Sequence, residues 1–136
     1  MEPRMNSSQS YPAGSQHPND LEERAFQFAK AVRLFIKNMP KTMAVIEDEK
    51  QLVCASGCAG ANYIEANEAL SDKDFIVRAK ISRKKVKESR YWLRLINETN
   101  DLVNADEAGT LIREADELEK ILTSIVEKSK WRLGDR

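Results

Sequence analysis

The sequence SDKDFIVRAKISRKKVKESRYWLRLI, residues 71–96, decides the fold class of this chain. Its apolar and small residues recur at alternating spacings of four and three, which is the period of one face of an α-helix. These residues are Phe75, Ala79, Ser82, Val86, Ser89, Leu93 and Ile96. Ser71 followed three residues later by Asp74 fits a capping box, so the pattern predicts a helix over residues 72–99.

The preceding part of the chain predicts another helix, over residues 20–39. Its stripe has the same alternating spacing and consists of Leu21, Ala25, Phe28, Val32, Phe35 and Met39. Asn19 and Glu22 fit a capping box at its start. Pro40 is expected to end it, because proline disfavours helical geometry in the residue before it.

The last long segment predicts a helix over residues 105–130, with Asn104 and Glu107 able to cap its start. Its stripe consists of Ala108, Leu111, Ala115, Leu118, Leu122 and Ile125, widened by Ile112, Ile121 and Val126. The breadth of this stripe indicates a helix that faces the core.

Residues 42–69 are the least obvious helix. The stretch ASGCAGA, residues 55–61, contains two glycines, each costing a helix about 1 kcal/mol relative to alanine. A loop is the alternative on propensity alone. Positions 53, 57, 60, 64 and 67 nevertheless continue a helical stripe, and small side chains let a neighbouring backbone approach closely. A helix with its small residues against a neighbour is therefore predicted.

Four helices joined by short links predict an all-α fold, an up-down-up-down four-helix bundle over residues 19–130 with a short C-terminal end at 131–136. The length of 136 residues suits one such domain. Residues 1–18 hold three of the four prolines, the only histidine and no apolar period, so a flexible tail is predicted there. The lack of a long apolar stretch predicts no membrane contact and a cytoplasmic location.

Charge is segregated along the chain. Residues 73–94 carry nine lysines and arginines against two acids, whereas residues 98–119 carry eight acids against one arginine. Six of the cations fall within about 120° of the helix at 100° per residue, and we call them the basic ridge. The basic ridge consists of Lys80, Arg83, Lys84, Lys87, Arg90 and Arg94.

Tyr91 lies within the same arc, so the basic ridge combines charges that attract phosphate with a ring able to stack on a base. This pattern suits a contact surface for RNA or DNA. The alternative is a solvated face paired with acids of neighbouring helices or of another subunit, in a protein-interaction scaffold.

The sequence offers little for catalysis or metal binding. Cys54 and Cys58 share one face of a helix but supply only two ligands, fewer than a closed zinc site needs. We expect them to be small buried side chains with free thiols. No phosphate-binding glycine loop and no nucleophile motif is present, and we predict a protein that is not an enzyme and has no cofactor or metal.

The segments QLVCASGCAGANYIEANEALSDKDF (51–75) and RAKISRKKVKESRYWLRLI (78–96) together resemble the bacterial four helix bundle protein family, also called the 23S ribosomal RNA intervening-sequence protein family. MPK at 39–41 and DELEKILTSIV at 116–126 support the resemblance, which covers residues 20–130. Cys54 departs from the basic residue that many relatives carry, which weakens any contact ascribed to that position.

The resemblance implies an up-down bundle, commonly assembled as a ring-shaped homopentamer, without established enzymatic activity. A related protein of the same fold is the accessory factor of diversity-generating retroelements, which binds nucleic acid and a reverse transcriptase. The resemblance thus implies self-association, with RNA, DNA or a protein as a further partner, and it favours the basic ridge as the contact surface.

Overall fold

The computed structural model describes residues 18–134, which form four helices and no strand. The helices are α1 (Pro18–Ile36), α2 (Met43–Asn67), α3 (Asp72–Glu98) and α4 (Ala105–Arg132). The predicted all-α class and the four predicted helices are confirmed, including the helical state of the glycine-containing stretch 55–61. Of the tail predicted at 1–18, only Pro18 falls within the described residues.

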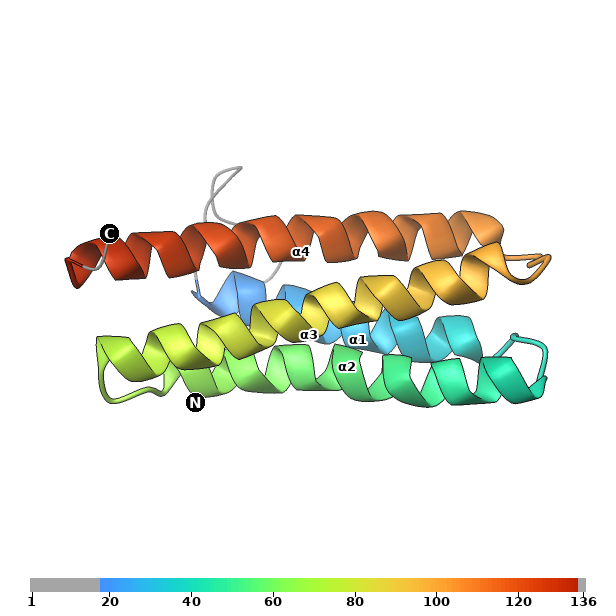
Figure 1. Ribbon diagram of the computed structural model, residues 1–136, viewed down its shortest axis with the longest axis horizontal. Coiled ribbons are helices and arrows are strands. Elements are labelled where there is room, and N and C mark those ends of the chain that lie inside the picture. The colour runs from blue at the N-terminus through green and yellow to red at the C-terminus, as the bar shows by residue number, and fades with distance from the viewer. Residues whose placement is uncertain (1–17, 135–136) are drawn as a thin grey trace, which may run out of the picture.

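The helices alternate in direction (Figure 1). α1 and α3 run one way and α2 and α4 run back, so the α1–α2 and α3–α4 links lie at one end of the bundle and the α2–α3 link at the other. Each helix packs against the two helices that flank it: α3 against α2 and α4, and α1 against the same pair. α1 packs less extensively on these neighbours than α3 does.

The core consists of the stripes that the period predicts on α1 and α3. All six residues of the first stripe are buried, five of them in α1 and Met39 in the link after it. Six of the seven on α3 are buried, with Phe75 partly covered. On α4 the predicted stripe residues are buried except the last one, because Val126 is buried there and Ile125 is only partly covered. Burying these apolar side chains is the main favourable term for a bundle of this kind.

The buried face of α2 differs from the predicted one. Leu52, Ala55, Ala59, Tyr63 and Ala66 are buried, whereas the predicted stripe is only partly covered and its Ile64 is exposed. The predicted stripe instead borders α1, where a Cβ on Gly60 would lie 3.5 Å from the Ala25 Cβ. The expected close approach is therefore present, but between α2 and α1 at the edge of the core.

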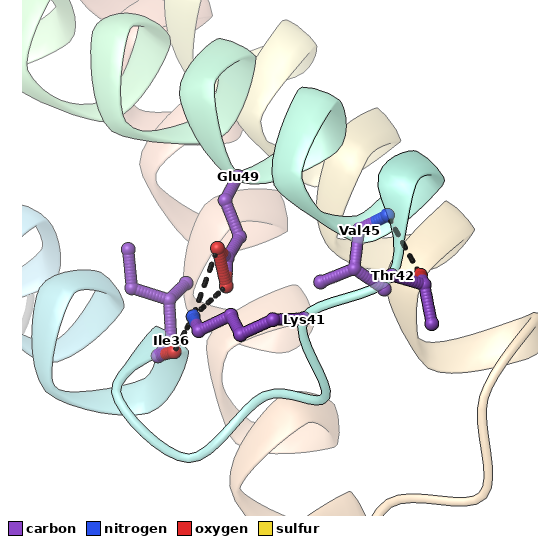
Figure 2. A network of polar contacts seen from close by, with 5 residues as sticks. All are labelled: Ile36, Lys41, Thr42, Val45 and Glu49. Carbon is purple, nitrogen blue, oxygen red and sulfur yellow. Dashed lines mark hydrogen bonds and ion pairs between the residues drawn. The ribbon is translucent and has the colours of Figure 1, made fainter.

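α1 ends at Ile36, three residues before the predicted end. In the link that follows, Lys41 bonds both the end of α1 and Glu49 of α2 (Figure 2). The Lys41 Nζ donates to the Ile36 carbonyl oxygen at 3.2 Å and to the Glu49 carboxylate oxygens at 2.6 and 3.1 Å. Met39 is still buried, but its N–H bonds the Ile36 carbonyl in a turn at 3.2 Å. Pro40 disfavours the helical conformation at Met39, so the helix stops before this residue. Lys41 stabilises the end of the helix because its ammonium group bonds the Ile36 carbonyl oxygen.

The helix starts follow the predicted caps in part. The Ser71 Oγ accepts from the Asp74 N–H at 3.1 Å, as predicted, and Thr42 makes the equivalent bond to Val45 at 3.2 Å. Asn104 precedes α4, as predicted, but makes no capping bond, and its side-chain oxygen and nitrogen are buried without a hydrogen-bond partner.

The capping box predicted at the start of α1 is wrong. The helix begins at Pro18, so Asn19 lies inside its first turn. The Glu22 carboxylate accepts a hydrogen bond from the Asn67 amide of α2 at 2.7 Å. A contact between two helices has thus taken the place of a local cap.

Candidate nucleic-acid interface

The basic ridge runs along α3, and the fold divides it into an outer and an inner part. Lys84, Lys87 and Arg94 are exposed, whereas the remaining three members are half-buried. Those three are Lys80, Arg83 and Arg90. Helix geometry accounts for Arg83 and Arg90, which lie closest to the buried stripe on the side that faces α4, whereas Lys80 lies farther round the helix.

Arg90 forms ion pairs with acids of α4. Its Nη1 lies 2.7 Å from the Asp116 Oδ1 and 3.1 Å from the Glu119 Oε1, both on α4. Asp116 also pairs with Lys120 at 3.1 Å, and the hydrogen bond that Lys120 donates to this carboxylate raises the pKa of Lys120. The alternative of pairing with neighbouring acids is therefore realised at Arg90, and a phosphate would have to displace two carboxylates to reach it.

The outer cations are differently placed. Arg94 makes one pair along its own helix, with the Nε 3.4 Å from Glu98, and both side chains are well exposed. Within residues 18–134, Lys84 and Lys87 make no ion pair. Exposed pairs of the Arg94 kind are weak and exchange readily with solvent ions. Lys84, Lys87 and Arg94 are therefore the cations of the basic ridge that an anionic partner can reach.

Tyr91 lies between these outer cations and presents its ring to solvent, with 56% of the residue exposed. The ring centroid lies 5.0 Å from that of Trp92, in an edge-to-face arrangement with an interplanar angle of 81°. Such a pair holds the tyrosine ring in place. A ring fixed among cations can accept a stacked base.

Lys85 lies next to the basic ridge along the chain but points to the other side of α3, towards α2. It pairs with Glu88 at 3.2 Å, and this hydrogen bond raises the pKa of Lys85. The pair lies near Cys58, whose thiol pKa is raised mainly by burial. Lys85 therefore belongs to the α2–α3 seam and lies outside the basic ridge.

The cysteines are placed otherwise than expected. Cys54 is exposed and Cys58 is half-buried, so the prediction of two buried side chains is wrong for Cys54. The error follows from the misassigned face of α2, because small residues occur all round this helix. Both thiols are free, and residues 18–134 contain no group of three or more histidine, cysteine or acidic side chains arranged to hold a metal ion.

The sequence did not single out the acids that meet Arg90. The opposite charges of residues 73–94 and 98–119 indicated that such pairs would form, but which of the eight acids meets Arg90 depends on how α4 is rotated and shifted against α3.

Among the four helices, none has the uninterrupted apolar length that a membrane crossing requires.

The comparisons with known proteins agree with this fold. The family model described as 23S rRNA-intervening sequence protein matches residues 19–124. Among curated proteins, none matches the chain significantly. A crystal structure of a protein with unknown function from the S23 ribosomal protein family of Bacteroides thetaiotaomicron is similar, with 29% identity and a TM-score of 0.69.

This similarity extends over 81% of the present chain and 97% of the Bacteroides protein. The family model covers all of α2 and α3 and most of the other two helices. The predicted resemblance is confirmed: the chain belongs to the family of 23S rRNA-intervening sequence proteins.

Proposed function

We propose that this protein is a non-enzymatic nucleic-acid binder of the bacterial cytoplasm. In this proposal RNA or DNA lies along the outer part of the basic ridge, with Lys84, Lys87 and Arg94 on phosphates and Tyr91 against a base. Arg83 and Lys80 border this surface. The observation that carries the proposal is that Lys84 and Lys87 flank an exposed, positioned aromatic ring without pairing to an acid of residues 18–134.

The proposed binding has little sequence preference. Lysines and arginines on a helix surface contact phosphates, and phosphate contacts position a nucleic acid without reading its bases. Base readout uses paired hydrogen-bond donors and acceptors such as asparagine or glutamine amides, which the outer part of the basic ridge does not contain. Affinity should therefore depend on salt much more than on sequence.

The decisive experiment is a salt titration of binding to labelled duplex DNA, followed by fluorescence anisotropy. The K84Q/K87Q variant should flatten the slope of log affinity against log salt by about two, since each neutralised phosphate contributes about 0.9. The control K30Q/K37Q removes two exposed lysines, one in α1 and one directly after it, and should keep the parent slope. Equal slopes for parent and K84Q/K87Q would refute the proposed surface.

Two further variants separate the roles within the basic ridge. Y91A should weaken single-stranded RNA or DNA more than duplex, by about 1 to 3 kcal/mol for a lost stack. R90Q removes the cation that Asp116 and Glu119 share, so it should lower thermal stability while leaving the salt slope close to that of the parent. A slope change in R90Q would mean that the α4 pairing opens on binding.

The second candidate is a protein-interaction scaffold, favoured by the pairing of Arg90 with acids of α4. The same charge complementarity, repeated between copies, would support a homo-oligomer, for which we propose a ring-shaped pentamer. Light scattering measures the oligomeric state. Capture from lysate with and without nuclease distinguishes the candidates, because only partners held through nucleic acid are lost after digestion.

A further inference from the structure

Cys54 and Cys58 lie one turn apart on α2 and form a preformed pair of thiols. Residues four apart on a helix are neighbours on its surface, with their Cβ atoms about 5 to 6 Å apart, so the two thiols lie on one side of α2. Cys54 is exposed and Cys58 is half-buried at the seam with α3, beside Lys85 and Glu88. The pair is thus open to solvent on the side of Cys54.

The number of ligands limits what such a pair can hold. Structural zinc takes four protein ligands, and residues 18–134 offer no third histidine, cysteine or acidic side chain grouped with these thiols to hold a metal. Soft thiolates instead favour soft, thiophilic centres. The centre that suits Cys54 and Cys58 is therefore a thiophilic one that binds two neighbouring sulfurs and needs no third protein ligand.

We propose that Cys54 and Cys58 form a bidentate site for trivalent arsenic carrying one organic substituent. Such arsenic keeps one bond to carbon and has two valences left, which is the number of thiols present. Its pyramidal geometry closes a narrow angle between neighbouring sulfurs, whereas mercury(II) prefers two sulfurs on opposite sides. Neither the family assignment nor the proposed nucleic-acid surface bears on this site.

The reaction is a condensation without oxidation or reduction. An organoarsenic(III) oxide exchanges its two arsenic–oxygen bonds for two arsenic–sulfur bonds, and the oxygen leaves as water with the two thiol protons. Cys54 reacts first because it is exposed, and Cys58 then closes the ring. Burial raises the pKa of Cys58 and disfavours its thiolate, so ring closure should accelerate as the pH rises.

The bridge would span residues 54–58 and thereby join successive turns of α2 across Gly57, in the stretch with the lowest helix propensity. The folded helix holds the two thiols one turn apart before binding, so the folded chain should bind the arsenical more tightly than the unfolded chain, and such preferential binding raises the apparent stability. The arsenical should therefore increase Tm, which gives a readout that is independent of the thiol chemistry.

The test uses phenylarsine oxide and the full chain, reduced with a phosphine that is then removed. Intact mass should show one phenylarsenic group per chain, a thiol assay should show the loss of both thiols, and Tm should rise. C54S, which changes an exposed residue, should bind at least about 100-fold more weakly because the second thiolate no longer acts intramolecularly. Circular dichroism checks that this variant remains folded.

The matched control is C54S/Q51C, which keeps two cysteines per chain but moves one thiol to an exposed position about 10 Å along the helix from Cys58. It should behave like C54S. The proposal is wrong if this control or C54S binds as tightly as the parent, if two arsenic groups attach per chain, or if the parent binds none.

Discussion

The phenol of Tyr63 is a buried group through which pH acts on stability. Only 2% of the residue is exposed, and burial raises the pKa of Tyr63, with the negative charge of Glu22 adding to the effect and a hydrogen bond with Asn67 opposing it. The folded state therefore favours the protonated phenol. Its contribution is fully present below the ordinary tyrosine pKa of about 10 and is lost as the pH rises through the higher folded value.

We therefore expect the free energy of unfolding of the parent to fall more steeply from about pH 9 to about pH 11 than that of Y63F, which cannot ionise. Urea denaturation at several pH values measures both slopes. Y91F is the control, because it removes the exposed tyrosine of α3 and should retain the parent slope. Parallel profiles for parent and Y63F would show that another group governs the alkaline limb.

At the scale of a helix, α2 has room for a stabilising change at Gly60. A Cβ there would lie 3.5 Å from the Ala25 Cβ, an ordinary van der Waals distance. G60A should therefore stabilise the protein by about 0.5 to 1 kcal/mol, through the higher helix propensity of alanine. G60L should destabilise it by about 1 to 3 kcal/mol, since the larger side chain meets the Ala25 backbone.

Thermal denaturation measures both changes, and G57A provides the comparison. A Cβ at position 57 would lie 3.1 Å from the Arg33 Nη2, so the guanidinium has to move away from the Val53 carbonyl that it bonds. G57A should accordingly stabilise less than G60A. If G60L proves as stable as the parent, α1 is not held closely against this part of α2.

At the scale of the whole molecule, the four helices are not equally secured. α3 packs extensively on both neighbours, whereas α1 packs less and is held to α4 partly by the paired hydrogen bonds of Arg24 to Glu114, at 2.7 and 2.9 Å. Regions with fewer tertiary contacts open at lower free energy. Native-state hydrogen exchange should therefore show weaker protection for the amides of Phe28 and Val32 than for those of Val86 and Leu93.

R24M should widen this difference, because it removes both bonds to Glu114, and K128M serves as the control on an exposed lysine of α4. Exchange measured by mass spectrometry resolves the two helices as separate peptides. Equal protection of α1 and α3 would indicate that the bundle opens only as a single unit.

The fold could be predicted because hydrophobic periodicity is a property of each segment alone. Most of the large apolar residues from Leu21 to Met39 and from Phe75 to Ile96 fall on one face, so each segment indicates its own buried face even though Phe26, Leu34 and Val77 are exposed. On α2 the alanines, glycines and cysteines are small on every side. Its buried face is decided by the neighbouring helices, which the segment does not encode.

The candidate site could be predicted only in outline. The arc on α3 follows from helix geometry and correctly brings Lys84, Lys87 and Tyr91 to one exposed face. Which cation of α3 pairs with the acids of α4 depends on the register between the two helices. That register depends on side-chain packing along the whole interface. Arg90 therefore could not be distinguished from its exposed neighbours before the structure was known.

The edge-to-face arrangement of Tyr91 and Trp92 gives the protein a spectroscopic label of its own. Ring centroids 5.0 Å apart permit efficient transfer of excitation energy from the phenol to the indole. Trp131, the other tryptophan, is well exposed near the end of α4. Since α4 runs antiparallel to α3, this end lies far from the end of α3 that carries Trp92. The emission of Trp92 should therefore respond to whatever covers Tyr91, and a W131F chain would report occupancy of this face of α3 without an added dye.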